Sequence, residues 1–254
     1  MKWMRFLVNG RERLGVLEGD TVHVHEGSMF SDARPTGEQF VVDGIEWMLP
    51  CVPGKMLALW NNFHAAADKN GWAVPTEPLY FVKTPNSFAA HRQPVAAVPA
   101  EVGRVAYEGE LAIVIGRRTR RVAVDEAASH IFGYTCANDL TAIELLQRDP
   151  SFPQWTRAKG FDGFGVIGPV IDTTFSLETA SVSTIVGGRE RQNYPLADMI
   201  FKPNELVSRL SHDMTLEPGD VILCGTSLGV LPMKAGTQVE VEIDGIGRLI
   251  NTYG

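Results

Sequence analysis

The stretch from Val105 to Ile115 places two glutamates, Glu108 and Glu110, in an otherwise largely apolar run. The run predicts a β-strand, in which side chains two residues apart point to the same face. Both carboxylates should therefore share a buried face of the strand. Two like charges in an apolar setting raise each other's pKa and cost free energy. A divalent cation would remove this conflict, and a third carboxylate, Asp139, completes an oxygen-only set that suits Mg²⁺, Ca²⁺ or Mn²⁺.

The composition excludes several classes of function. The formal net charge of −7 over 254 residues argues against a nucleic-acid surface. The nearest basic cluster, residues 117–121, lies between an expected strand and an expected helix and is predicted to be a solvated connection. No apolar run approaches the length of a membrane-spanning helix. We therefore expect no nucleic-acid partner and no membrane segment.

The cysteines indicate the redox environment. Cys51, Cys136 and Cys224 are odd in number, far apart, and in no spacing typical of metal ligands. This pattern predicts reduced thiols and a cytoplasmic location.

Two units are expected along the chain. Asn9-Gly10 follows an apolar segment and is a hairpin signal. Residues 21–25 alternate with the period of a strand. A proline-bearing segment at 49–54 then interrupts the pattern. We predict a small N-terminal β domain over residues 1–52 and a larger domain over residues 53–254.

The larger unit is rich in short strands and poor in helical signals. One helix is predicted over residues 124–132 with Gly133 as its stop, and another begins at Pro203. The alanine-rich segment 63–69 predicts a third, short helix. Many short strands with few helices predict a β-dominated α/β fold. The sequence has no glycine-rich phosphate-binding loop.

Several motifs, taken in order, resemble those of the fumarylacetoacetate hydrolase family. The segment 107–116 is similar to the family's metal-binding strand, and residues 132–142 resemble the segment that carries its third carboxylate. Further similar segments are Arg157 to Phe164, Gly168-Pro169, Asn193 to Phe201 and Leu216 to Val230. Residues 1–50 resemble the small N-terminal domain that many members carry. Because the resemblance covers most of the chain, we identify the chain as a member of this family.

The resemblance implies a fold and a set of site residues. The family fold is a mixed β-roll built around a metal site, usually in a homodimer. Glu108, Glu110 and Asp139 would be the ligands of Mg²⁺ or Mn²⁺. Lys159 would hold the carboxylate of a 2-oxo acid substrate or the developing oxyanion, and Thr226 would donate to the substrate carboxylate.

The sequence departs from the family pattern at the catalytic dyad. The family places a histidine and, three residues later, a glutamate on a short mobile helix. His64 falls in place, but the glutamate position holds Ala67. Asp68, four residues after His64, shares its helix face and is the candidate partner. We predict His64 as the general base, Asp68 as its partner, and residues 60–72 as a mobile lid.

A second departure concerns the substrate side. Family hydrolases often carry an arginine four residues after the aspartate and a glutamine three residues beyond it. Those places hold Ile143 and Leu146 here, with Gln147 adjacent as a candidate substrate-binding residue. The loss of the arginine removes a bidentate clamp for a second carboxylate. This departure favours the isomerase and decarboxylase members, some of which also lack the arginine.

Each candidate residue has a structural alternative. Asp139 would instead serve as a cap or turn residue, and Thr226 as a turn residue. Lys159 and Asp162 would form a surface ion pair, and the two glutamates would lie on a solvent face. These alternatives remain open at the level of the sequence.

The expected function is that of a metal-dependent enzyme acting on a 2-oxo or β-diketo acid, in aromatic-compound catabolism. Hydrolytic cleavage of a carbon–carbon bond, with His64 activating water, is the first expectation. Enol–keto tautomerisation or decarboxylation is the alternative, because it needs only the metal, a proton shuttle and an enolate site. A non-catalytic member that keeps the fold is a third hypothesis. A homodimer is expected from the resemblance.

Overall fold

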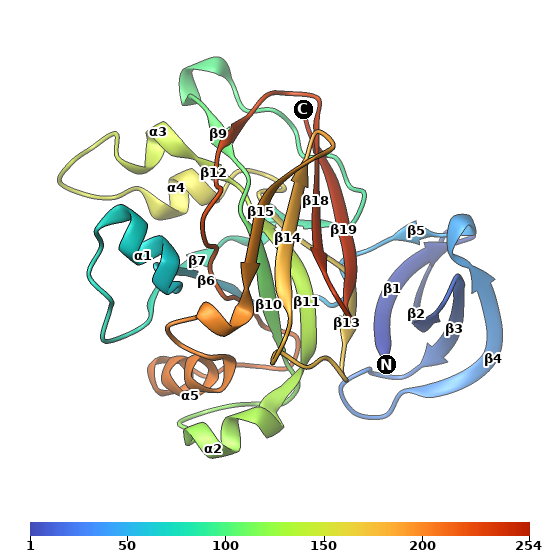
Figure 1. The fold of residues 1–254 in the computed structure, drawn as a ribbon. Coiled ribbons are helices and arrows are strands. Elements are labelled where there is room, and N and C mark those ends of the chain that lie inside the picture. The colour runs from blue at the N-terminus through green and yellow to red at the C-terminus, as the bar shows by residue number, and fades with distance from the viewer.

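The computed structural model describes residues 1–254. Strands predominate and helices are few and short (Figure 1), as the sequence predicts. A 12-stranded sheet, a four-stranded sheet and a small three-stranded sheet make up the framework. The largest cluster of buried apolar side chains includes residues of both larger sheets.

The 12-stranded sheet runs through the whole molecule. Its strands, in spatial order, are β4 (Arg34–Val41), β3 (Thr21–Glu26), β2 (Arg11–Glu18), β1 (Lys2–Val8), β13 (Gly165–Asp172), β11 (Ile131–Asp139), β10 (Gly109–Ile115), β16 (Val221–Leu223), β6 (Met56–Trp60) and β7 (Leu79–Lys83). Two short strands join it from the side, β5 (Glu46–Trp47) on β1 and β8 (Phe88–Ala90) on β13. Most pairs are antiparallel, but β16–β6 and β13–β8 are parallel, so the sheet is mixed.

The four-stranded sheet covers the centre of the large sheet (Figure 1). Its order is β15 (Arg189–Pro195), β14 (Ser181–Val186), β18 (Thr237–Ile243) and β19 (Gly247–Tyr253). Buried and partly exposed residues alternate along β14, β18 and β19, as the period of a half-buried strand requires. The third sheet is short and consists of β12 (Thr141–Ala142), β9 (Val105–Ala106) and β17 (Pro232–Met233).

Helices flank the sheets without forming a continuous layer. They are α1 (His64–Asn70), α2 (Val124–Ala127), α3 (Ile143–Leu146), α4 (Trp155–Lys159) and α5 (Pro203–Asp213). In Figure 1, α1, α3 and α4 lie together on one side, and α2 and α5 lie below. None of them is long and apolar enough to cross a membrane. The predicted helices at residues 63–69 and after Pro203 are confirmed.

Two local predictions are wrong. The stretch 105–115 is not one strand, because β9 ends at Ala106 and β10 begins at Gly109 in a different sheet. The helix expected over 124–132 ends at His130, after one short α-helix and one 3₁₀ turn. Gly133 lies inside β11 rather than at a helix end, where a Cβ atom would come within 2.5 Å of the Asp172 carbonyl oxygen. Its backbone therefore sits where only glycine fits.

The N-terminal strands form a separate lobe that continues the large sheet. Asn9 and Gly10 have φ angles of 51° and 71°, which form the predicted hairpin turn between β1 and β2. β1 pairs with β13 through Lys2 and Trp3, so the lobe is joined to the large sheet by hydrogen-bonded backbone. The boundary between independent domains at residue 52 stays a prediction. The three cysteines are buried and unpaired, in agreement with the predicted reduced thiols.

His91 links the N-terminal lobe to β19 and gives the fold a predicted acid sensitivity. Its Nδ1 accepts a hydrogen bond of 3.1 Å from the Ile250 N–H, and its ring packs edge-on against Trp47 at 4.6 Å. Burial, helped by the nearby Arg92 charge, lowers the pKa of His91 from 6.5 to about 4. The unfolded chain therefore takes up this proton at higher pH than the folded chain does. The contribution of His91 to the unfolding free energy is therefore fully present above about pH 6.5 and is lost as the pH drops toward 4.

We expect this one group to remove roughly 3 kcal/mol of unfolding free energy between pH 6.5 and pH 4. His91→Asn keeps an acceptor near the Ile250 N–H but does not titrate, so its stability should vary less over that range. Urea unfolding at a series of pH values measures both slopes. Equal slopes for the wild type and the variant would show that His91 is not the sensitive group.

Candidate active site

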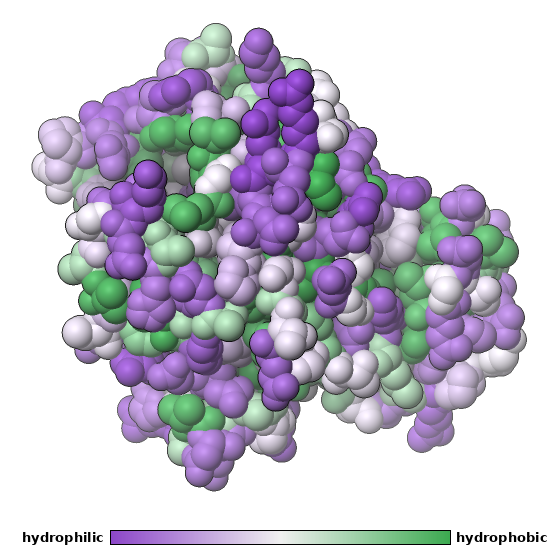
Figure 2. All heavy atoms as spheres, viewed as in Figure 1, coloured by the Kyte–Doolittle hydropathy of each residue, from purple (hydrophilic) through white to green (hydrophobic).

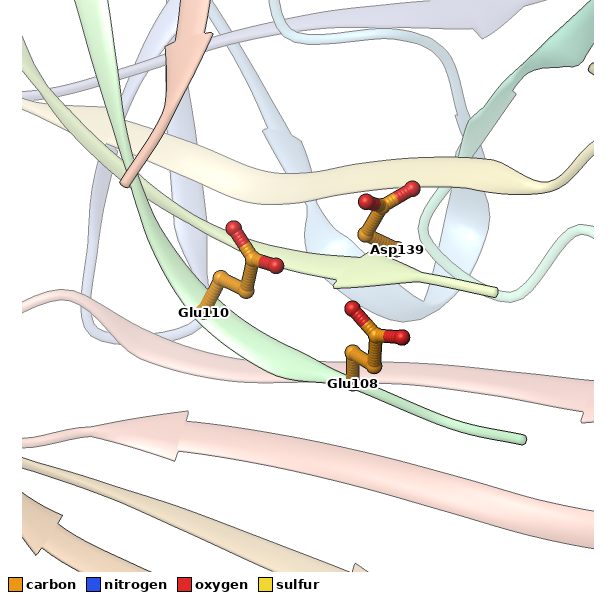
Figure 3. Close-up of side chains that lie close together, drawn as sticks. All are labelled: Glu108, Glu110 and Asp139. Atoms are coloured by element: carbon orange, nitrogen blue, oxygen red, sulfur yellow. The ribbon is translucent and has the colours of Figure 1, made fainter. Parts of the chain in front are cut away.

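Three buried or half-buried carboxylates converge where β10 begins and β11 ends. Each of Glu108, Glu110 and Asp139 offers one oxygen, and these oxygens lie within 4.8 Å of one another. Figure 3 shows the three side chains directed toward the same small region. Glu110 and Asp139 are fully buried. The arrangement brings together the three residues predicted from the sequence.

The backbone pairing of β10 with β11 sets this geometry. Gly109 pairs with Asn138 and Glu110 with Ala137, so the end of β11 lies beside the start of β10. The Asp139 N–H donates to the Glu108 carbonyl at 2.9 Å, and the Glu108 N–H donates to the Asn138 side chain at 3.0 Å. These bonds hold Glu108 in place although it lies in the break between β9 and β10.

Gly109 is required between the two glutamates. A Cβ atom there would lie 2.0 Å from the Thr184 Oγ1, which is far inside contact distance. The Gly109 N–H donates to Gln192 Oε1 at 3.0 Å, and its carbonyl accepts from Tyr194 and Thr226. The four-stranded sheet therefore fixes the backbone from which both glutamates project.

Two buried lysines neutralise part of the negative charge. Lys159, at the end of α4, has its Nζ 2.7 Å from Glu108 Oε2 and 2.7 Å from Asp139 Oδ2. Lys83, at the end of β7, has its Nζ 2.7 Å from Asp139 Oδ1 and donates to the Lys159 carbonyl at 2.6 Å. Asp162 instead accepts from Asn86 on the surface, so the alternative of a Lys159–Asp162 surface pair is wrong.

The carboxylates differ in their electrostatic setting. Burial, reinforced by the charges of Asp139 and Glu108, raises the pKa of Glu110 well above its ordinary value. Burial also raises the pKa of Glu108, against the opposing charge of Lys159. For Asp139 burial is outweighed by the Lys159 and Lys83 charges, which hold its pKa below the ordinary value. For Lys159, burial is outweighed by Asp139 and Glu108, which raise its pKa and keep it a cation.

The donor set fits a hard divalent cation. Glu110 Oε2 accepts the Gly225 N–H at 2.8 Å, but the buried Glu110 Oε1 has no hydrogen-bond partner. A buried carboxylate oxygen without a partner is costly, and a cation at this point would satisfy it. Both oxygens of Glu108 and Oδ2 of Asp139 accept hydrogen bonds, and the buried Asp139 Oδ1 has only the ion pair with Lys83. Each carboxylate has about four lone-pair sites and so can also bind an ion.

Thr226 and Gln192 form a second polar layer beside the carboxylates. The Thr226 hydroxyl donates to the Gly109 carbonyl at 2.9 Å and accepts from Gln192 Nε2 at 2.9 Å. In this arrangement Thr226 fastens the loop 225–229 to β10, while its side chain also lines a cavity that Glu108 borders. Its predicted role as a donor to substrate stays a prediction.

The predicted dyad does not lie at the carboxylates in this arrangement. His64 and Asp68 on α1 are exposed, and neither lines the two cavities that Glu108 borders. Ala67, at the family's glutamate position, is fully buried. The residues of α1 that face the second of these cavities are Ala66, Lys69 and Asn70. Asn61 Nδ2 donates to the Ala73 carbonyl at 2.9 Å, which ties the two ends of the predicted lid together.

A cleft of about 820 Å³ opens beside Glu108. Gln147, Ile143 and Leu146 line it, although Gln147 is otherwise exposed. The substrate-binding role of Gln147 stays a prediction. In Figure 2 hydrophobic residues gather around a hollow at the upper left, in the region that α3, α4 and β12 occupy in Figure 1.

Sequence reasoning missed Lys83 and Gln192. Lys83 ends an apolar strand, where a lysine is ordinary, so the sequence gives no sign that it is fully buried. Gln192 lies in a polar run, Arg189 to Asn193, that reads as an exposed edge strand. Only the packing of β15 against the start of β10 turns its amide toward Gly109.

Comparison with known proteins identifies the family. The model described as fumarylacetoacetate hydrolase C-terminal matches residues 55–253, and one described as Rv2993c-like N-terminal matches residues 1–50. The chain therefore belongs to the fumarylacetoacetate hydrolase family of enzymes, and the predicted β-dominated α/β fold of that family is confirmed.

Similar proteins include both named and uncharacterised members. A protein of Archaeoglobus fulgidus is 39% identical over 98% of this chain and 94% of its own length. The oxaloacetate tautomerase YisK of Bacillus subtilis is 37% identical over 81% of this chain and 71% of its own length.

Two solved structures are informative. The 5-carboxymethyl-2-hydroxymuconate delta-isomerase of Mycobacterium smegmatis has a TM-score of 0.92 at 32% identity and covers 100% of this chain and 99% of its own. A maleylpyruvate hydrolase of Sphingobium, in complex with manganese(II) and pyruvate, has a TM-score of 0.80 at 25% identity, with 100% and 98% covered.

Proposed function

We propose that this protein is a divalent-metal-dependent enzyme that interconverts the keto and enol forms of a 2-oxo acid, or decarboxylates such an acid. The observation that carries the proposal is the combination of a buried carboxylate cluster with a dyad position that lacks its glutamate. Glu108, Glu110 and Asp139 meet at one point, whereas Ala67 is buried and His64 faces solvent. Enolate chemistry needs a metal held by such carboxylates, and it does not need the His–Glu dyad.

The residues of the site have separate tasks in this proposal. Glu108, Glu110 and Asp139 would hold Mg²⁺ or Mn²⁺, which supplies Lewis acidity to an enolate oxygen. Lys159 stays protonated between Glu108 and Asp139, so it stabilises negative charge that develops on the substrate and does not act as a base. The Thr226 loop borders the same space and offers backbone N–H donors to the substrate carboxylate.

Two of the relatives support this choice. One carries the name of an oxaloacetate tautomerase and one that of a delta-isomerase, and both reactions move a proton through an enol. A hydrolase is also among the similar structures. Hydrolytic carbon–carbon cleavage is therefore the second candidate function, and it requires His64 to reach a water molecule beside the carboxylates.

Three substrates separate the reactions. In D₂O with Mg²⁺, tautomerisation exchanges the C3 protons of pyruvate for deuterium, which proton NMR follows directly. Decarboxylation of oxaloacetate releases CO₂ and pyruvate. Hydrolysis of acetylpyruvate consumes water and releases acetate and pyruvate. We expect Mg²⁺-dependent exchange of pyruvate. Cleavage of acetylpyruvate at a rate that exceeds exchange would establish the hydrolase instead, and no turnover of any substrate would indicate a non-catalytic member.

Substitution of the dyad residues tests the choice independently. Because His64 is exposed, we expect His64→Ala to keep Mg²⁺-dependent exchange within about threefold of wild type, whereas loss of a general base costs roughly 10²- to 10⁴-fold. Asp68→Asn should leave the exchange rate unchanged, because Asp68 is exposed as well. A loss above about 100-fold in His64→Ala would show that α1 closes over the site and that the dyad acts after all.

We also propose a homodimer, which rests on the family resemblance. Multi-angle light scattering at micromolar concentration should give twice the chain mass of 27.8 kDa. A mass equal to one chain would contradict the dimer.

A further inference from the structure

We propose that the substrate is a 2-oxo acid with one carboxylate and a sizeable aromatic or apolar tail, and that the 820 Å³ cleft beside Glu108 receives this tail. The inference rests on the proposed function, because it assumes that the 2-oxo acid group lies at the carboxylate cluster. It goes further in naming the part of the substrate that the cleft selects.

The lining of the cleft carries almost no charge. Of its 14 lining residues, ten are hydrophobic, and only Glu108, at the end next to the cluster, carries a carboxylate side chain. No arginine or lysine lines it. A second substrate carboxylate in this space would therefore be desolvated without a counter-charge, which is costly.

The basic residues that flank the lining segments or line the neighbouring cavity do not line this cleft. Arg104 pairs with Glu144 at 2.5 Å, and Arg148 donates to the carbonyls of Glu101 and Val102. Lys69 lines the neighbouring cavity, which shares Trp60 and Trp72 with this one, but it does not line the cleft. At α3, the side chains turned into the cleft are Ile143 and Leu146.

Aromatic rings form a continuous wall that starts at the cluster. Lys159 Nζ lies 5.5 Å from the centre of the Phe81 ring. Phe81 stacks on Trp155 with ring centres 5.0 Å apart and planes 16° apart. The ring centres of Trp155 and Trp60 are 5.9 Å apart, and those of Trp60 and Trp72 are 5.0 Å apart. Trp72 remains 39% exposed, so a ligand tail along this wall would cover apolar surface that is now in contact with water.

Charge balance at the cluster points the same way. With a bound dication, the three carboxylates and the two lysines leave a single positive charge. One substrate carboxylate neutralises it, and a second would be in excess. The cluster and the cleft thus favour the same substrate class, one acidic head and one uncharged tail.

Calorimetric titration in Mg²⁺ tests the inference with three ligands. Pyruvate has no tail, 2-oxo-4-phenylbutanoate has an aromatic tail, and 2-oxoadipate has an acidic tail. We expect the aromatic acid to bind at least about tenfold more tightly than either of the others, since burial of one ring contributes more than this. It should also change tryptophan fluorescence, because three tryptophans line the cleft.

Substitutions at Ile143 then test the origin of the preference. Ile143→Arg supplies a cation and should reverse the order of the aromatic and acidic ligands, while Ile143→Met, which adds length without charge, should keep it. Circular dichroism checks that both variants are folded. If either variant fails to fold, the order of affinities in the wild-type protein still tests the inference.

The outcomes separate the two proposals. Equal or tighter binding of 2-oxoadipate, with Mg²⁺-dependent exchange of pyruvate intact, overturns the tail inference alone. Absence of both pyruvate exchange and Mg²⁺-dependent binding of any 2-oxo acid overturns the proposed function, and with it this inference.

Discussion

Glu110→Gln should abolish Mg²⁺ binding and reduce turnover by roughly 10²- to 10⁴-fold, because the stabilisation that a metal gives to developing charge amounts to several kcal/mol. The folded structure should survive. Burial raises the pKa of Glu110 and so lowers the cost of its neutral acid form, which glutamine resembles in shape and charge. The hydrogen bond from the Gly225 N–H to Oε2 can be kept by the glutamine oxygen.

Thermal unfolding measures this prediction directly. At Mg²⁺ a hundredfold above its dissociation constant, wild type should gain about 2.7 kcal/mol, or roughly 5–10 °C in melting temperature. Without Mg²⁺, Glu110→Gln should have the melting temperature of wild type, and addition of Mg²⁺ should not raise it. Glu126→Gln, an exposed glutamate on α2, is the matched control and should respond as wild type does. An equal Mg²⁺ response in Glu110→Gln would contradict the assignment of this ligand.

Lys159→Met should act on stability as well as on catalysis. The substitution removes the cation that Glu108 and Asp139 share, and breaking a buried ion pair on one side costs about 3–5 kcal/mol. For a chain of this length, that loss lowers the melting temperature by roughly 6–20 °C. Turnover should fall by about 100-fold or more, because a donor aimed at developing negative charge is lost.

The response to metal distinguishes this variant from a general packing defect. Without Lys159, a dication has less positive charge to compete with, so Mg²⁺ should stabilise Lys159→Met by more than it stabilises wild type. Lys234→Met, an exposed lysine without an ion pair, controls for the substitution type and should leave the melting temperature unchanged. A destabilisation that Mg²⁺ does not relieve would show that Lys159 serves packing alone.

Local sequence pattern predicts much of the fold. The Asn9-Gly10 turn, the helix at Pro203 and the β-dominated class follow from turn chemistry and periodicity within a few residues. The strand break at Tyr107 and Glu108 could not be predicted this way. It arises because β9 and β10 pair with different partners that lie far away in the chain, and no local signal marks that change of sheet.

The candidate site was predictable in its carboxylates and not in their surroundings. Glu108, Glu110 and Asp139 are unusual because they are acids in apolar runs, and that is visible in the sequence. Lys83 and Gln192 are ordinary residues whose role depends on distant strands arriving beside them. The orientation of α1, which leaves His64 exposed, likewise depends on packing: the Ala65 N–H donates to Asp198, and Ala67 faces inward.

Anomalous diffraction from crystals soaked in Mn²⁺ and pyruvate tests the central claim most directly. We expect one strong manganese peak within ligand distance, about 2.2 Å, of oxygens of Glu108, Glu110 and Asp139, with the pyruvate carboxylate and keto oxygens facing the same ion. A crystal whose manganese lies elsewhere, or whose three carboxylates stay paired only with Lys83 and Lys159 at a Mn²⁺ concentration that saturates turnover, would contradict it.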